Sequence, residues 1–167
     1  MADADVLFAV HRQGVYRYLC RIVAQAEMAH DLTQEVFLRV SRAPVPATDD
    51  AGRRAWVFKI ARNLALNHLR DAGRRMPAVA LTDAARPATQ ELAAAINEAL
   101  AALPPLDRDV FLMRETAGLS YAEIAAACEI TVEAVRARLH RARMELRASL
   151  DGPMRAQRQL TVRLGER

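Results

Sequence analysis

Residues 119 to 148 read LSYAEIAAACEITVEAVRARLHRARMELRA, and this stretch predicts a helix–turn–helix. Ser120 followed by Glu123 forms a capping box, in which the hydroxyl accepts from an unpaired amide and the carboxylate reaches back to the cap. A short helix is expected over Tyr121 to Ala127, and a turn over Cys128 to Thr131. Because Thr131 can cap a helix, a second helix is expected to begin there.

That second helix is expected to run to about Leu150 and to have two distinct faces. At about 100° per residue, an apolar stripe faces the core, made of Val135, Leu139, Ala142 and Leu146. Arginines on the remaining surface suit DNA phosphates and guanine edges. The candidate duplex-reading residues are Glu133, Arg136, Ala137, Arg138, His140 and Arg141. Five arginines could also form a plain solvated face, but the capping box and turn spacing favour DNA binding.

Glu129 is the residue of this stretch that departs from the pattern. The tight turn of a helix–turn–helix often carries glycine, since other residues are strained at positive φ. A glutamate at this place therefore predicts an altered turn.

The 167-residue chain can form one domain or two small ones, and its composition predicts an all-α fold with two small helical domains. Its net charge of +4 is unevenly distributed. Residues 51–75 carry seven Arg and Lys against one Asp, and the arginine-rich stretch lies far away in sequence. Two separated basic blocks are the pattern that two nucleic-acid surfaces would produce.

The two cysteines, Cys20 and Cys128, stand alone in apolar helical surroundings, so neither a disulfide framework nor a metal site is indicated. No signal peptide and no membrane-spanning run is evident, so we expect a cytoplasmic protein without membrane insertion. No cofactor is expected.

The N-terminal half predicts two amphipathic helices, 5–23 and 27–42, and the first should turn Leu7 and Phe8 inward. The second carries a polar face at i, i+3, i+4 and i+7, made of Asp31, Gln34, Glu35 and Leu38. An exposed leucine among acids and an amide indicates a protein-binding patch. A bland solvated helix face would have the same pattern, so the residues alone leave both interpretations open.

A loop is predicted at 43–52 by its prolines and its Asp-Asp-Ala-Gly ending, and the most basic helix of the chain comes after it. One face of this helix combines an aromatic ring, amides and cations, which suits a single DNA strand. The candidate strand-binding residues are Trp56, Lys59, Arg62, Asn63, Asn67 and Arg70. Alternatively, Trp56 packs in the core.

Little periodicity is present in 76–90, which is expected to be a linker between domains. Helices are predicted over 91–103 and 106–118, packed behind the helix–turn–helix. The tail, 151–167, opens with Asp-Gly-Pro and is expected to be mobile or a short helix.

Four motifs, in this order, resemble the extracytoplasmic-function (ECF) sigma factors of bacterial RNA polymerase, in the sigma-70 family. They are DLTQEVFLRV, AWVFKIARNLALNHLR, ALPPLDRDVFLMRETAGLSYAEIA and AVRARLHRAR, within a match over 5–150. The resemblance implies a region-two domain (1–75), a linker (76–90), a region-four domain (91–150) and a tail (151–167). It also implies a factor that directs core polymerase to promoters and helps open them, with no catalytic chemistry of its own.

The resemblance assigns a role to each candidate face. The face from Asp31 to Leu38 is similar to the one that grips the β′ clamp helices, and the β flap is a second implied polymerase contact. The stripe with Lys59, Asn63 and Asn67 is similar to the surface that reads the minus-ten element. The outer face of the last helix falls where the minus-thirty-five element is read, and an anti-sigma factor is the usual partner. Departures from the frequent family residues, at Asn67, Ala134 and Ala137, bear on the promoter sequence.

A conventional helix–turn–helix repressor or activator is the main alternative. It would explain 119–150, but neither the face from Asp31 to Leu38 nor the second basic block. An adaptor that binds only proteins is disfavoured by the two basic blocks. An enzyme is not expected, because no acid–base pair, nucleophile or metal cluster is evident.

Overall fold

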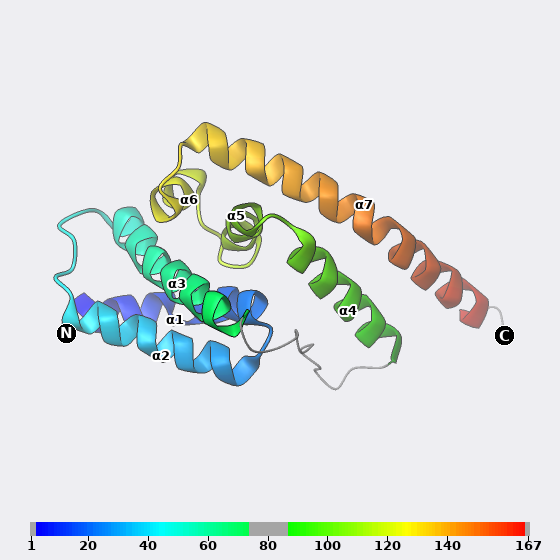
Figure 1. The fold of residues 1–167 in the computed structure, drawn as a ribbon, viewed down its shortest axis with the longest axis horizontal. Helices are drawn as coiled ribbons and strands as arrows, with labels where there is room; N and C mark the ends of the chain where they lie inside the picture. Colours follow the sequence, from blue (N-terminus) through cyan, green and yellow to red (C-terminus); the bar gives the residue numbers. More distant parts are fainter. Residues whose placement is uncertain (1–2, 74–86, 166–167) are drawn as a thin grey trace.

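A computed structural model describes the backbone of residues 3–73 and 87–165, and the side chains of 3–73 and 90–152. Every element in these residues is helical, which confirms the predicted all-α fold. The helices are α1 (Asp3–Val23), α2 (Ala26–Arg42), α3 (Asp50–Ala72), α4 (Pro87–Ala102), α5 (Pro105–Glu115), α6 (Tyr121–Cys128) and α7 (Val132–Gly165). Figure 1 shows α1, α2 and α3 side by side, with α5 and α6 lying between α3 and the long α7.

The bundle of α1, α2 and α3 is built around large buried side chains from all three helices. Tyr18 and Phe58 are fully buried and meet edge to face, with ring centroids 5.9 Å apart. Val36 and Val40 supply the buried side of α2. On α3, Val57, Ala61 and Leu64 are buried, and Ile60 on the same side of the helix is half-buried. This packing fixes which face of α3 remains for other contacts.

The second group of helices forms the predicted helix–turn–helix, carried by α6 and α7. All four residues of the predicted core stripe of α7 are buried: Val135, Leu139, Ala142 and Leu146. Fully buried Met113 of α5 and Ile124 of α6 complete this core. The outer face of α7 is therefore fixed by burial of the opposite face.

Two predicted boundaries were wrong. The loop predicted at 43–52 ends at Asp49, whose carboxylate accepts from the Gly52 amide at 2.8 Å and caps α3. The Asp-Asp-Ala-Gly run looked like a turn, but its first residue starts a helix. Glycine at position 52 avoids a collision, because a Cβ there would meet the side chain of Thr48, which would have to shift.

The second wrong boundary is the end of the last helix. It was expected near Leu150, but α7 continues through Asp151-Gly152-Pro153 to Gly165. A proline removes one amide donor from a helix, and here the backbone stays helical through it. The predicted linker lies outside the described residues up to 86, and its last four residues form the first turn of α4.

Candidate nucleic-acid and polymerase interfaces

The turn of the helix–turn–helix is set by local hydrogen bonds. The Ser120 hydroxyl accepts from the Glu123 amide at 3.2 Å, and the Glu123 carboxylate accepts from the Ser120 amide at 2.6 Å. The Thr131 hydroxyl accepts from the Ala134 amide at 3.1 Å and caps α7. Glu129 has φ 58° and ψ 44°, so the left-handed conformation favoured by glycine is kept with a glutamate. The turn is thus not altered in backbone conformation.

The outer face of α7 presents four of the six predicted duplex-reading residues together. Glu133, Arg136, Ala137 and His140 are all exposed. Arg138 and Arg141 are instead bound to Asp107 of α5, with the shortest contacts at 2.6 and 3.2 Å. The structure therefore separates the predicted group into four outward residues and two that contact the protein.

The predicted strand-binding stripe of α3 is similarly divided. Asn63, Asn67 and Arg70 are exposed. Trp56 is half-buried and packs against the hydrophobic core, as the alternative interpretation expected in part. The remaining two residues, Lys59 and Arg62, make ion pairs with the second group of helices.

The predicted polymerase-binding face of α2 is on the surface. Asp31 and Gln34 are exposed, the Leu38 side chain is 43% exposed, and half-buried Glu35 pairs with Arg39 at 2.8 Å. An exposed leucine in a polar surround is the feature on which the protein-binding prediction depended.

Beside this face lies a hollow that the sequence did not predict. A cavity of about 360 Å³ opens between α1 and α2 and is lined by residues that include Phe8, Tyr16 and Gln34. Phe8 was expected to point inward, but it is 42% exposed. Its ring lies edge-on to Phe37 at 5.1 Å, and the Arg12 guanidinium lies over it at 5.5 Å. The helical period is compatible with an inward or an outward Phe8, because its neighbour Leu7 is the residue that packs in the core.

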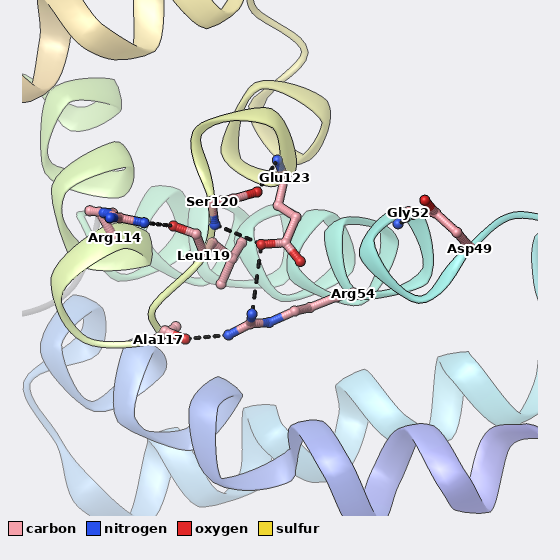
Figure 2. Close-up of polar contacts among 8 residues, drawn as sticks. All are labelled: Asp49, Gly52, Arg54, Arg114, Ala117, Leu119, Ser120 and Glu123. Carbon is pink, nitrogen blue, oxygen red and sulfur yellow. Dashed lines mark hydrogen bonds and ion pairs between the residues drawn. The ribbon is translucent and has the colours of Figure 1, made fainter.

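An unforeseen contact joins α3 to the helix–turn–helix. The Arg54 guanidinium donates to the Ala117 carbonyl and lies 3.6 Å from a carboxylate oxygen of Glu123 (Figure 2). Glu123 thus serves both the capping box and an ion pair to α3. Figure 2 also shows Arg114 reaching the Leu119 carbonyl, at 2.8 Å, which fixes the segment leading into α6.

A second part of this contact is buried around Asp109 of α5. Its carboxylate accepts from the Tyr18 hydroxyl at 3.4 Å and from Arg62 at 2.8 Å. Burial raises the pKa of Asp109, and the positive charge of Arg62 opposes that rise. Burial, and then the nearby Asp109 charge, raises the pKa of Tyr18 far above its ordinary value.

The third part is exposed and involves the unusual turn residue. The Lys59 ammonium lies 2.7 Å from the Glu129 carboxylate, and this hydrogen bond lowers the pKa of Glu129. In this arrangement the helix–turn–helix covers part of the predicted strand-binding stripe. Nothing in the sequence pairs residues 70 positions apart, so this contact could not be predicted.

Metal binding requires a cluster of ligating side chains, and membrane insertion requires a long apolar helix. Within the described ranges, no group of three or more His, Cys, Asp or Glu side chains could hold a metal ion. None of the helices described is long and apolar enough to cross a membrane.

Comparison with known families gives two matches that succeed one another along the chain. The family "Sigma-70 region 2" matches residues 7–75, and "Sigma-70, region 4" matches residues 93–146. The chain is 35% identical to the ECF RNA polymerase sigma factor SigE of Mycolicibacterium smegmatis, covering 88% of this chain and 61% of that protein. It is 30% identical to the RNA polymerase sigma-H factor of Pseudomonas aeruginosa, over 90% of this chain and 88% of the relative. The ECF RNA polymerase sigma-E factor of Escherichia coli is 33% identical, over 83% and 82%.

Two solved structures have a fold similar to that of this chain. CnrH in complex with the cytosolic domain of CnrY superposes with a TM-score of 0.69 at 26% identity, over 89% of this chain and 88% of that one. The sigma factor RpoE in complex with the anti-sigma factor NepR, from Bartonella quintana, has a TM-score of 0.69 at 20% identity and shares the fold.

Proposed function

The chain belongs to the ECF sigma factors of the sigma-70 family, which direct promoter-specific transcription initiation, and we propose that three of its surfaces carry this activity. Sigma factors are non-enzymatic subunits of RNA polymerase, and they bind core polymerase and promoter DNA. The proposal concerns which residues of this chain make those contacts, and in which arrangement.

The outer face of α7 is proposed to read the minus-thirty-five element as duplex DNA. Its four exposed residues present a carboxylate, a guanidinium, a small alanine methyl group and an imidazole on one side of a helix. A recognition helix in the major groove needs such side chains, with a small residue that lets the bases approach. The capping box and the left-handed turn at Glu129 support this role, because they place α7 as the second helix of a helix–turn–helix.

The stripe on α3 is proposed to bind the minus-ten element as an opened strand. Exposed Asn63 and Asn67 can bond to base edges that pairing would hide, and Arg70 can neutralise phosphate. Lys59 and Arg62 belong to the same surface but are paired with Glu129 and Asp109. The helix–turn–helix must therefore leave α3 before the whole stripe can contact a strand.

The third surface, from Asp31 to Leu38 on α2, is proposed to bind the clamp helices of the polymerase β′ subunit, with the region-four helices contacting the β flap. Its acids and its exposed leucine suit a partner that is basic and apolar. We assign residues 1–75 to the region-two domain, 76–90 to the linker, 91–150 to the region-four domain and 151–167 to the tail. Since polymerase acts in the bacterial cytoplasm, that is the proposed location.

An anti-sigma factor is the proposed regulatory partner. Two solved structures with a similar fold are both complexes, one with the cytosolic domain of CnrY and one with the anti-sigma factor NepR. Isolation of the chain from its native cell under gentle conditions, and then mass spectrometry, would identify the partner that accompanies it.

The observation that carries the proposal is that exposed polar and basic residues gather on two separate helix faces, the outer face of α7 and the stripe of α3. The test is reconstitution: the chain is added to core RNA polymerase with a library of promoter fragments, and run-off transcripts are measured. Promoter-dependent transcripts that need the chain are expected. Duplex DNA binding by the chain alone, with no initiation in any combination with core, would instead identify a conventional repressor or activator.

A further inference from the structure

Asp107 lies in the first turn of α5 and is one of the few buried carboxylates among the described residues. Its side chain is 1% exposed. It accepts from Arg138 at 2.6 Å, and from the Nε and Nη2 atoms of Arg141 at 3.2 and 3.4 Å. Because a buried carboxylate is costly unless it is paired and hydrogen-bonded, these contacts are needed to keep Asp107 in place.

Both arginines come from α7, and they lie three positions apart on one side of it. The Arg138 side chain is 29% exposed and the Arg141 side chain is 54% exposed. Arg141 meets the carboxylate through two nitrogens, the geometry that fixes a guanidinium in direction as well as in position. One carboxylate of α5 therefore holds two cations of the recognition helix.

The other basic residues of the recognition helix are held differently. Arg136 and His140 are exposed on the outer face, with no hydrogen-bond or ion-pair partner recorded among the described residues. Arg143 pairs with Glu115 at 2.7 Å, but both side chains of that pair are nearly half exposed. The buried acid thus acts selectively on Arg138 and Arg141.

This selection has a consequence for DNA discrimination. Phosphate contacts by arginine give affinity for any sequence, and each contact adds about 0.9 to the slope of log K against log salt. Arginines withheld from phosphate lower the affinity for random DNA, whereas the base-reading residues are unaffected. The ratio of specific to random binding rises as a result.

We infer that Asp107 is a specificity-determining positioning residue, which keeps Arg138 and Arg141 on the protein and leaves Glu133, Arg136 and His140 to contact the promoter. The inference rests on the proposed duplex-reading role of α7. It also changes two residue roles, since Arg138 and Arg141 were predicted from the sequence as DNA contacts.

The first test uses Arg141→Gln in the full-length chain, a change at a half-exposed site that leaves the contact between Asp107 and Arg138 in place. Binding is measured over a salt series with a short duplex of random sequence, and with a duplex selected from a random library by the wild-type chain. We expect the slope on both duplexes to match the wild type. A fall of about 0.9 in the slope on the random duplex would overturn the inference, because Arg141 would then be a phosphate contact.

The second test uses Asp107→Asn, which keeps the shape of the side chain and removes its charge. Freed guanidiniums should raise the slope on the random duplex by about 0.9 to 1.8, for one or two new phosphate contacts. The ratio of selected to random binding should fall, and adding Arg141→Gln should reverse part of both changes. The control is Glu98→Gln, which makes the same charge change at an exposed site of α4.

A proportional loss of affinity for both duplexes, with an unchanged slope, would mean that Asp107 is merely structural and would overturn the inference. If Asp107→Asn does not fold, as judged by helicity and melting, the inference is decided by the slopes of log K against log salt for Arg141→Gln. A wild-type chain that binds neither duplex would overturn the duplex-reading role of α7 together with this inference. Those outcomes are separate from the run-off assay, which tests sigma activity with core polymerase.

Discussion

The Lys59 ammonium lies 2.7 Å from the carboxylate of Glu129, so the basic helix of the region-two part touches the turn of the helix–turn–helix. With the Arg54–Glu123 and Arg62–Asp109 pairs, this bond holds a closed arrangement in which α6 lies on α3. One residue proposed to bind the promoter strand is thereby neutralised by a residue that departs from the usual glycine. The pair thus joins a residue of the proposed strand-binding face to a residue at which this chain departs from the usual glycine.

Reversing the charge of Glu129 should favour the open arrangement. In Glu129→Lys two cations would face each other across the contact, while the left-handed backbone strain stays as it was. Because exposed ion pairs are weak, we expect a shift of only about twofold to fivefold in the open-to-closed ratio. Small-angle scattering at low salt should show a larger radius of gyration. Glu133→Lys, with the same charge change on an outward residue, is the matched control, and Lys59→Glu added to Glu129→Lys should restore the compact form.

Glu35→Arg should weaken binding to core polymerase roughly 100-fold, since a like charge is placed in a complementary interface. Stability should hardly change, because the exposed Glu35–Arg39 pair that is lost contributes only about 0.3–0.5 kcal/mol. Core affinity by fluorescence anisotropy and the melting temperature are the two measurements. Glu98→Arg on α4 controls for charge, and core affinity equal to wild type in Glu35→Arg would rule out this face.

Glu133 is expected to choose bases, since a carboxylate can accept from a cytosine amino group in the major groove. Glu133→Gln should relax preference at one or two positions, by an amount that reflects about 1–3 kcal/mol of discrimination. A panel of duplexes with single base changes measures it, and Glu145→Gln, at another exposed position of α7, is the control. Equal loss across the whole panel would show that Glu133 reads no base.

Asn63→Ala is expected to depress open-complex formation while closed-complex formation is maintained, because Asn63 can reach base edges only in an opened strand. Permanganate reactivity of promoter thymines, beside a gel shift of the same complex, separates the two steps. Premelted promoter DNA should rescue part of the defect, and Asn97→Ala is the control. Lys59 is best left unchanged here, since its replacement would also loosen the closed arrangement. Normal opening in Asn63→Ala would make the stripe structural.

Acid should weaken the packing of α1 on α3 through His11. Burial, and then the positive charge of Arg54, lowers the pKa of His11 below its ordinary value of 6.5. A folded-state pKa below the unfolded value gives stability that is present above pH 6.5 and is lost as the pH falls through the folded value. The free energy of unfolding should therefore decline on acidification, and less steeply in His11→Gln. Urea titrations at several pH values measure this, with His140→Gln as the control. Identical slopes in wild type and His11→Gln would contradict it.

The sequence was sufficient for features that depend on local spacing. The capping box at Ser120, the core stripe of α7 and the exposed Leu38 can be deduced from periods of three and four residues, and the structure confirms all three. The end of α7 was missed because Asp-Gly-Pro is a frequent stop, and the start of α3 because Asp49 serves as a cap.

The contacts between distant segments could not be predicted in the same way. Arg62 was placed on the strand-binding surface by its position on the helix, but its bond to Asp109 depends on how two groups of helices meet. Arg138 and Arg141 are a similar case, since only the fold places Asp107 beside them. Periodicity gives the direction of a side chain from its own helix, and it does not identify what lies opposite.

The unbroken course of α7 has a mechanical consequence. At 1.5 Å per residue, its 34 residues make a rod of about 51 Å that begins just after the turn at Glu129. The two ends of a rigid helix move together, so a small tilt of the end proposed to read DNA moves Gly165 through a wide arc. A partner that bound only the distal end of the rod could thereby shift the end proposed to read the promoter.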